Sequence, residues 1–213
     1  PTWEALLADP AIDAVSICAA NTAHAELTIA ALRAGKHVLC EKPMAICESD
    51  FEEMMTAAQQ NGVVLMEAMR PAHSPGLALV RQLMGRIGTV RRATLQFCQY
   101  SSRYDRVRAG APHINAFDPA LCNAAILDMG CYPIHALISL FGEPAHVSAE
   151  AYHLESGFEA GGIALLRYSG FVCEAIWSKV CKQAAPTTFM GEDGSILLST
   201  HLIDDVVRIF DTV

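Results

Sequence analysis

The chain has 213 residues, of which 52% are hydrophobic and 18% charged, and its formal net charge at pH 7 is −8. The apolar content is sufficient for a sizeable core, whereas the acidic balance argues against a nucleic-acid-binding surface. The sequence shows neither an apolar run long enough for a membrane span nor the basic and apolar regions of a signal peptide.

The first third of the sequence predicts strands and helices in alternation. Helices are expected at residues 3–8, 23–34 and 48–60, and strands at residues 14–20, 38–40 and 63–66. Gly35 and Gly62 follow two of these helices as C-terminal stop signals. This order predicts right-handed βαβ units that form a parallel sheet covered by helices on both faces.

The remaining residues follow a different pattern. A helix is expected at 76–84, a long strand at 89–99, and a helix at 132–140 that Gly142 ends. The irregular stretch 101–122 is long enough to be either functional or mobile. Later strands with hairpin-sized gaps predict an antiparallel sheet with a helix on one face; they lie at 147–153, 163–168, 172–178, 187–190, 196–199 and 206–210.

The eight cysteines include no Cys-x-x-Cys pair. Several lie in apolar strands, where a reduced thiol packs as a small hydrophobic group, so we predict a reducing, cytoplasmic location. Cys131 and His135 lie one helical turn apart, and His37 and Cys40 share a strand, but neither pair supplies the four ligands of a structural zinc site. We therefore expect no metal site.

The second predicted strand ends in Glu41, Lys42 and Pro43. A lysine at the carboxyl end of a buried strand faces the crevice in which open α/β sheets bind ligands. Because a buried ammonium is costly without a partner, Lys42 is a candidate functional residue. The alternative interpretation is a turn whose lysine extends to solvent.

A second cluster contains Asp128, Gly130 and Tyr132. Asp128 and Tyr132 are four residues apart, so they share a face if the segment is helical. Pro133 is tolerated only near a helix start, which places that start here. The alternative is that Asp128 caps the helix and Tyr132 is a packed aromatic residue.

Four segments of the chain resemble motifs of the Gfo/Idh/MocA oxidoreductases, in the same order. They are NTAH (21–24), AALRAGKHVLCEKP (30–43), MEAMR (66–70) and LDMGCY (127–132). The resemblance implies an α/β fold, in which a partial Rossmann-type parallel sheet is followed by an α+β domain with a large antiparallel sheet. It implies NAD or NADP as cofactor and a sugar, polyol or cyclic diol as substrate. Tyr132 stands where many members have His, as in the dihydrodiol dehydrogenase and glucose–fructose oxidoreductase branch.

The resemblance also implies a mechanism, namely hydride transfer between nicotinamide C4 and a carbinol carbon. Tyr132 would exchange the hydroxyl proton as general acid–base. The ammonium of Lys42 would favour the tyrosinate and steady a developing alkoxide. Asp128 would orient substrate or lysine. These three residues are the predicted catalytic group.

Further residues are candidates for binding on the same grounds. The predicted cofactor-binding residues are Ala20, Asn21, His24, Glu41, Lys42 and Arg70, and the predicted substrate-binding residues are Lys42, Arg103, Asn123 and Tyr132. His24 is equally well explained as a residue of the first helical turn, and Arg70 as a surface arginine. Asn123 begins a stretch that replaces a glycine-rich segment common in relatives.

We predict two domains, a partial dinucleotide-binding domain at 1–70 and a substrate and dimerisation domain at 71–213. No Gly-x-Gly-x-x-Gly phosphate loop occurs in the sequence, so we expect a piece of a longer enzyme, although a natural short form that starts at Pro1 stays open. A homo-oligomer through the open sheet face is expected. The alternative function is a non-catalytic relative that senses a ligand or partner.

Overall fold

The computed structural model of the chain describes residues 2–198 and 207–211. These residues form two compact units. Unit 1 comprises residues 1–69 with 120–122, and unit 2 comprises residues 70–119 with 123–213. The predicted boundary between residues 70 and 71 stays a prediction, and each unit is described separately below.

Unit 1 alternates strands and helices, as the residue pattern predicts. Its strands form a three-stranded parallel sheet in the order β1-β2-β3. Gly35 and Gly62 both adopt positive φ angles, of 75° and 63°, which explains why glycine ends α2 and α3. The elements are α1 Trp3–Ala8, β1 Ala14–Ile17, a 3₁₀ turn Asn21–Ala23, α2 His24–Arg33, β2 His37–Cys40, α3 Glu48–Asn61 and β3 Leu65–Glu67.

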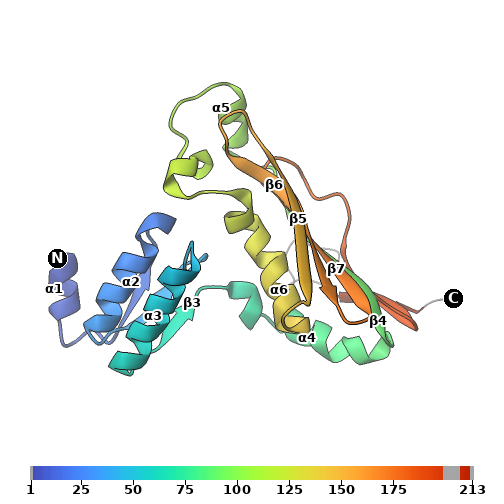
Figure 1. Cartoon of the computed structure of the whole chain (residues 1–213), viewed down its shortest axis with the longest axis horizontal. Helices are drawn as coiled ribbons and strands as arrows, with labels where there is room; N and C mark the ends of the chain where they lie inside the picture. The colour runs from blue at the N-terminus through green and yellow to red at the C-terminus, as the bar shows by residue number, and fades with distance from the viewer. Residues whose placement is uncertain (1, 199–206, 212–213) are drawn as a thin grey trace. The chain divides into compact units, whose positions relative to one another are not determined.

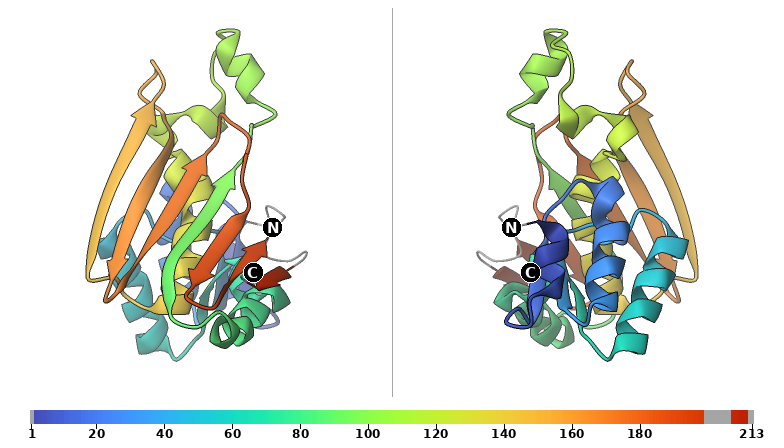
Figure 2. Two further views of the ribbon diagram at one scale, coloured as in Figure 1. Left: turned by 90° about the vertical axis from the view of Figure 1, so that its right-hand side faces the viewer. Right: turned by 90° about the vertical axis from the view of Figure 1, so that its left-hand side faces the viewer.

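The helices of unit 1 cover one face of this sheet (Figure 2, right). Val15 and Val38 face the helices and belong to a buried cluster with residues of α2 and α3. Leu39 and Met66, which alternate with such positions, are each 42% exposed. The prediction of a sheet covered on both faces is therefore wrong for the described residues. Strands of three or four residues are too short to reveal an alternating pattern in the sequence.

Unit 2 contains a larger sheet with helices on one face (Figure 1). Within the described residues the strand order is β10-β9-β8-β4-β7-β6-β5. The helices are α4 Pro75–Leu83, α5 Tyr104–Arg108 and α6 Cys131–Phe141, with further 3₁₀ turns at Arg70–His73, Met84–Arg86 and Asn115–Phe117. A last 3₁₀ turn, Pro119–Leu121, begins in unit 2 and ends among the residues 120–122 of unit 1. The strands are β4 Val90–Cys98, β5 His146–His153, β6 Glu159–Tyr168, β7 Phe171–Ser178, β8 Thr187–Gly191, β9 Gly194–Leu198 and β10 Val207–Asp211.

The sheet of unit 2 is mixed, because β4 and β7 pair in parallel while the other neighbouring strands are antiparallel. The expectation of an antiparallel sheet therefore fails for one pair in its centre. Hairpins join β5 to β6, β6 to β7 and β8 to β9, and turn signals in the sequence reveal such connections. The pairing of β4 with β7 joins strands far apart in the sequence, and no local signal specifies its direction.

Three local features differ from the expected elements. The irregular stretch contains a helix, α5. The predicted helix at 132–140 is preceded by a π-helical turn, Ile126–Gly130, that runs into α6. Strand β6 begins at Glu159, four residues earlier than predicted. The residue pattern misses this start because Gly161 and Gly162 are not typical strand residues. The structure requires glycine at position 161, since a Cβ there would lie 2.7 Å from the carbonyl oxygen of Trp177.

Candidate active-site segments

Lys42 follows strand β2 at the carboxyl edge of the unit 1 sheet. Residues 41–44 form a tight connection, here called the Lys42 turn, with a cis peptide bond between Lys42 and Pro43. The backbone N–H of Glu41 donates to Ile17 O over 2.9 Å, so the parallel ladder between β1 and β2 continues into the turn. Lys42 is half-buried. The predicted position at a strand end is confirmed, whereas its catalytic role stays a prediction.

His24 supports the Lys42 turn from the first residue of α2. Its side chain is 1% exposed. Nδ1 lies 2.9 Å from Pro43 O, and Nε2 lies 3.1 Å from Ala19 O. Both ring nitrogens thus face carbonyl acceptors, which links the loop after β1 to the loop after β2. A neutral imidazole donates through one nitrogen, so the tautomer decides which carbonyl receives the hydrogen bond. Because both nitrogens of this 1% exposed side chain face protein carbonyls, the geometry favours the alternative, structural interpretation of His24.

Glu67 supports the same turn from β3. Its Oε1 accepts a hydrogen bond from the Met44 backbone N–H over 2.8 Å. The neighbouring Ala68 N–H donates to Cys40 O over 2.7 Å. Sequence reasoning noted the segment 66–70 but assigned no role to Glu67, and only the pairing of β3 with β2 brings it to the turn.

The second candidate segment comprises residues 126–132 of unit 2, here called the tyrosine segment. Asp128 lies inside its π-helical turn, whose N-cap residue is Ala125. The interpretation of Asp128 as a helix cap is therefore wrong. Instead, Asp128 Oδ2 lies 2.8 Å from the ammonium nitrogen of Lys179, and the Lys179 side chain is 7% exposed.

Glu159 and Trp177 hold the start of the tyrosine segment. Glu159 Oε2 accepts from the Ile126 backbone N–H over 2.7 Å, and Glu159 Oε1 accepts from Trp177 Nε1 over 2.8 Å. A carboxylate at a helical N-terminus satisfies an otherwise unpaired donor and favours the helix dipole. The turn is thus attached to both β6 and β7.

Gly130 and Tyr132 complete this segment. A Cβ at Gly130 would lie 2.9 Å from Trp177 Cδ2, so only glycine lets the turn pack against the indole. The ring of Tyr132 packs against Phe97 with 5.0 Å between the centroids. The alternative of a packed aromatic residue is therefore correct for the ring, and it is compatible with a catalytic hydroxyl.

The other predicted binding residues lie at several places. In unit 1, Ala20 is exposed and Asn21 Nδ2 donates to Cys122 O over 3.0 Å. In unit 2, Asn123 Nδ2 donates to Asn115 O over 2.7 Å. Arg70 and Arg103 are both exposed, at the start of a 3₁₀ turn and just before α5. Their binding roles stay predictions.

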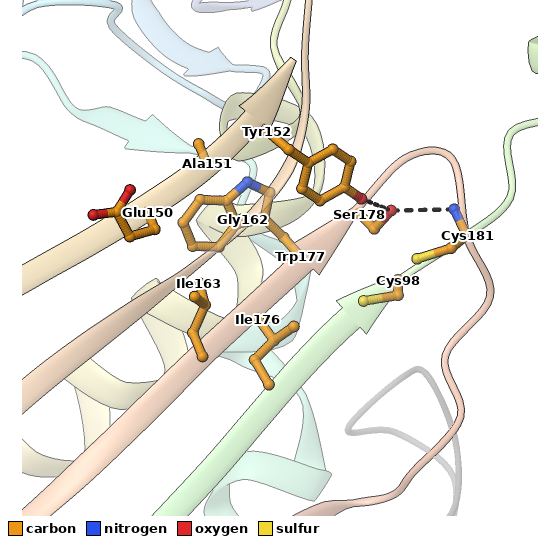
Figure 3. Close-up of a pocket in the computed structure, with 10 residues that line it drawn as sticks. All are labelled: Cys98, Glu150, Ala151, Tyr152, Gly162, Ile163, Ile176, Trp177, Ser178 and Cys181. Atoms are coloured by element: carbon orange, nitrogen blue, oxygen red, sulfur yellow. Dashed lines mark hydrogen bonds between the residues drawn. The ribbon is translucent and has the colours of Figure 1, made fainter. Parts of the chain in front are cut away.

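A hollow of about 400 Å³ lies on the unit 2 sheet, and it contains none of the predicted site residues. Figure 3 shows Tyr152 and Ser178 pointing toward one another across it, with 2.7 Å between their hydroxyl oxygens. Burial raises the pKa of the Cys98 thiol in its wall to about 11. Cys98 is therefore protonated at neutral pH and is no nucleophile there.

Two further findings concern the described part of the chain. Among residues 2–198 and 207–211, no three His, Cys, Asp or Glu side chains converge on a possible metal position. None of the helices described here has the length and apolarity needed to cross a membrane.

Comparisons with known proteins identify the family. Residues 1–69 match the family model described as "Oxidoreductase family, NAD-binding Rossmann fold", and residues 79–197 match the GFO/IDH/MocA C-terminal domain. The chain belongs to the Gfo/Idh/MocA oxidoreductases. The predicted family and the predicted fold class, a small parallel sheet followed by a larger sheet with helices, are therefore confirmed.

Relatives with known activities include two dehydrogenases. The chain is 44% identical over 195 residues to scyllo-inositol 2-dehydrogenase (NADP⁺) IolU of Bacillus subtilis, covering 92% of the chain and 59% of IolU. It is 30% identical over 210 residues to trans-1,2-dihydrobenzene-1,2-diol dehydrogenase of Xenopus laevis, covering 94% and 60%. The chain thus spans about three-fifths of the length of these relatives.

A solved structure supports the same fold. A mutant of the 3-ketoreductase KijD10 of Actinomadura kijaniata, in complex with TDP-benzene and NADP, is 26% identical with a TM-score of 0.85. The match covers 99% of this chain and 65% of KijD10.

The residues at the carboxyl edge of the unit 1 sheet are compatible with part of a nicotinamide cofactor. Ala19 and Ala20 follow β1 as exposed residues, and their small side chains would leave room for a flat group, although their carbonyl oxygens face His24 Nε2 and the Ala23 N–H. The Lys42 turn lies at the carboxyl end of the adjacent strand, where α/β sheets bind nucleotides. Ala20, Glu41 and Lys42 are the residues that would hold the cofactor here, and the sequence contains no Gly-x-Gly-x-x-Gly loop for its pyrophosphate.

Proposed function

We propose that the protein to which this chain belongs is an NAD(P)-dependent dehydrogenase or reductase. Its substrate class would be a sugar, polyol or cyclic diol with a CH–OH group at the reacting carbon. The observation that carries the proposal is that both predicted proton-handling residues stand on backbone anchored by buried polar contacts. His24 anchors the Lys42 turn, and Lys179 anchors the tyrosine segment. The activities of the relatives support the same class.

The bound nicotinamide would accept or supply the hydride. The residues of this chain would handle the proton and the charge. Tyr132 would take the hydroxyl proton during oxidation and return it during reduction. Lys42 would supply a positive charge that favours the ionised phenol and the developing alkoxide. Asp128, held by Lys179, would orient the substrate.

The binding roles are part of the same proposal. Ala20, Asn21, Glu41 and Arg70 would contact the cofactor, while Arg103 and Asn123 would contact the substrate. His24 would act through the Lys42 turn rather than by touching the cofactor. A single test is whether Ala20→Val, and substitution of each of the other residues to alanine, raises the KM for cofactor or for substrate.

The experiment that tests the proposed function is a titration of the purified chain with NADPH and NADH, followed by nicotinamide fluorescence. Micromolar binding, followed by oxidation of scyllo-inositol or of a trans-dihydrodiol with NADP⁺ or NAD⁺ as the hydride acceptor, would support it. The test variants are Lys42→Met, which removes the ammonium group, and Tyr132→Phe, which removes the phenol hydroxyl. A folded chain that binds neither cofactor at millimolar concentration would leave two explanations, a piece of a longer enzyme or a ligand-sensing relative. The same titration on a longer form of the protein would separate them, because a longer form that also fails to bind would contradict the proposed function.

We further propose that a second copy of the chain covers the open face of the unit 2 sheet. This face is free of helices (Figure 2, left) and presents apolar side chains such as Ile163, Leu165 and Met190, which are 37–41% exposed. Exposed apolar patches of this kind mark interfaces. Light scattering would show a dimer that Leu165→Glu converts to a monomer, whereas a monomeric parent chain would contradict the assignment. The cytoplasmic location stays a prediction.

A further inference from the structure

Lys179 is a buried cation with partners of three kinds. Its ammonium nitrogen lies 2.8 Å from Asp128 Oδ2 and donates to Ala116 O over 2.8 Å. It also lies 5.1 Å and 5.7 Å from the ring centroids of Phe117 and Phe158, within the range of cation–π attraction. This set of contacts fixes the ammonium from several sides.

The backbone of Lys179 is equally constrained. Its N–H donates to Ala160 O over 3.0 Å, and its carbonyl accepts from the Ser101 N–H over 3.0 Å. Lys179 therefore starts from a fixed point directly after β7. From there its side chain reaches two other parts of unit 2, the 3₁₀ turn that contains Ala116 and the tyrosine segment.

The two partners of the ion pair differ in exposure. The Lys179 side chain is 7% exposed, whereas the Asp128 side chain is 38% exposed. A pair that served only the core would be buried on both sides. Here the buried lysine holds a carboxylate that solvent or a ligand reaches, in a segment that places Tyr132 one turn later.

A second buried lysine provides a comparison. Lys36 is 7% exposed, and its ammonium donates to the carbonyl oxygens of Asp9 and Ile12 over 2.7 and 2.8 Å. These carbonyls belong to the connection between α1 and β1, so Lys36 closes a loop through neutral acceptors. Lys179 instead forms an ion pair with a carboxylate, that of Asp128, which lies four residues before the predicted catalytic Tyr132.

We propose that Lys179 is a positioning residue for the tyrosine segment. As the counter-ion of Asp128 it holds that carboxylate in place and offsets its negative charge one helical turn before Tyr132. Loss of the positive charge beside that carboxylate would hinder ionisation of the phenol. Lys179 therefore keeps the phenol able to release its proton. This inference rests on the proposed function of Tyr132 as the general acid–base.

The test uses the full chain with ¹³C-labelled tyrosine rings and follows the Cζ signal of Tyr132 against pH. The chain has five tyrosines, and Tyr132→Phe identifies the signal. Lys179→Met removes the ammonium and leaves the carboxylate, so the titration midpoint of Tyr132 should rise. Asp128→Asn removes the carboxylate and leaves the ammonium, so the midpoint should fall. Loss of packing alone would not move the two midpoints in opposite directions.

The control is Lys182→Met, which removes one positive charge at an exposed position three residues away. The proposal would be overturned if the Tyr132 titration midpoint in Lys179→Met equalled that in Lys182→Met. It would also be overturned if the midpoint moved in the same direction in Lys179→Met and in Asp128→Asn. If Lys179→Met does not fold, the double variant Lys179→Met/Asp128→Asn can be used instead, because it removes both charges of the ion pair. Its midpoint should lie above that of Asp128→Asn, and equal midpoints would overturn the proposal.

The outcome is independent of the activity assay, because the titration needs neither cofactor nor substrate. Opposite shifts in an inactive chain would retain the electrostatic link and show that it does not depend on turnover by this chain. An active chain without these shifts would retain the function and remove Lys179 from its mechanism.

Discussion

The Lys42 turn and the tyrosine segment each present a predicted catalytic group, but they are stabilised differently. The Lys42 turn is held through its backbone, at Pro43 O by His24 and at the Met44 N–H by Glu67. The tyrosine segment is held at the Ile126 N–H by Glu159 and, in addition, through a charged side chain, by the pair of Asp128 with Lys179. The support of the Lys42 turn depends on hydrogen-bond geometry, whereas the ion pair of the tyrosine segment depends on opposite charges.

The difference predicts where each region is fragile. A backbone carbonyl or N–H needs only a partner of suitable geometry, so neutral substitutes are tolerated. A buried charge tolerates no loss of its counter-ion, because its desolvation is then uncompensated. Substitutions that remove charge and keep shape should therefore affect the two regions unequally.

The largest expected effect is on catalysis. Tyr132→Phe should lower kcat by about 10²–10⁴-fold, the usual contribution of a general acid–base, and leave the KM for cofactor unchanged. Steady-state kinetics with the substrate identified in the screen would measure it. Tyr152→Phe, which changes an exposed tyrosine, is the matched control and should retain activity. A Tyr132→Phe variant with the same kcat as Tyr152→Phe would contradict the catalytic role of Tyr132.

A pair of matched amide substitutions compares the two supports directly. Asp128→Asn removes the carboxylate that faces the buried Lys179 ammonium. Because the Asp128 side chain is 38% exposed, this should lower the free energy of unfolding by about 1.5–3 kcal/mol. Glu67→Gln keeps an oxygen that can accept from Met44, and should cost under about 1 kcal/mol. Urea unfolding measures both. Equal losses would show that charge matters as much at the Lys42 turn.

A smaller effect is expected from packing in the tyrosine segment. Gly130→Ala places a Cβ 2.9 Å from Trp177 Cδ2, inside van der Waals contact. Overpacking of this kind costs about 1–3 kcal/mol. Gly85→Ala is the control, because no atom lies within 4 Å of its added Cβ. Thermal unfolding should separate the two variants, and equal melting temperatures would show that the indole moves freely.

The smallest effect concerns pH. Burial raises the pKa of the Cys173 thiol in the unit 2 core to about 12. Unfolded thiols ionise near pH 8.5, so above that pH the folded state binds more protons and the free energy of unfolding falls as pH rises. The stabilising contribution is complete below about pH 8.5. In Cys173→Ala the free energy of unfolding should fall less steeply as pH rises from about 8.5 to about 10. A slope equal to that of the parent chain would contradict the contribution assigned to Cys173.

Local sequence signals predicted most of the elements. Gly35 and Gly62 ended their helices as expected, because positive φ angles at helix ends favour glycine. The π-helical turn before α6 was missed, because its geometry depends on Trp177 and Glu159 from distant strands. Helix α5 was missed because it spans only Tyr104–Arg108, within a stretch of weak periodicity.

The candidate site was predicted in the same uneven way. Lys42 and Tyr132 were found because each belongs to a short run of residues that resembles a family motif. Glu67, Glu159 and Lys179 received no role, since their partners lie 23, 33 and 51 positions away in the sequence. A lone lysine after an apolar strand gives no local signal of burial or of an ion pair.

By itself, the sequence determined the family, the order of strands and helices, and the residues that present the predicted chemistry. These follow from composition, periodicity and contiguous motifs, all of which are local properties of the chain. Only the tertiary structure decided the parallel pairing of β4 with β7, the exposed face of each sheet, and the anchors His24 and Lys179. Those features depend on contacts between distant segments, whose free energy exists only once the chain has folded.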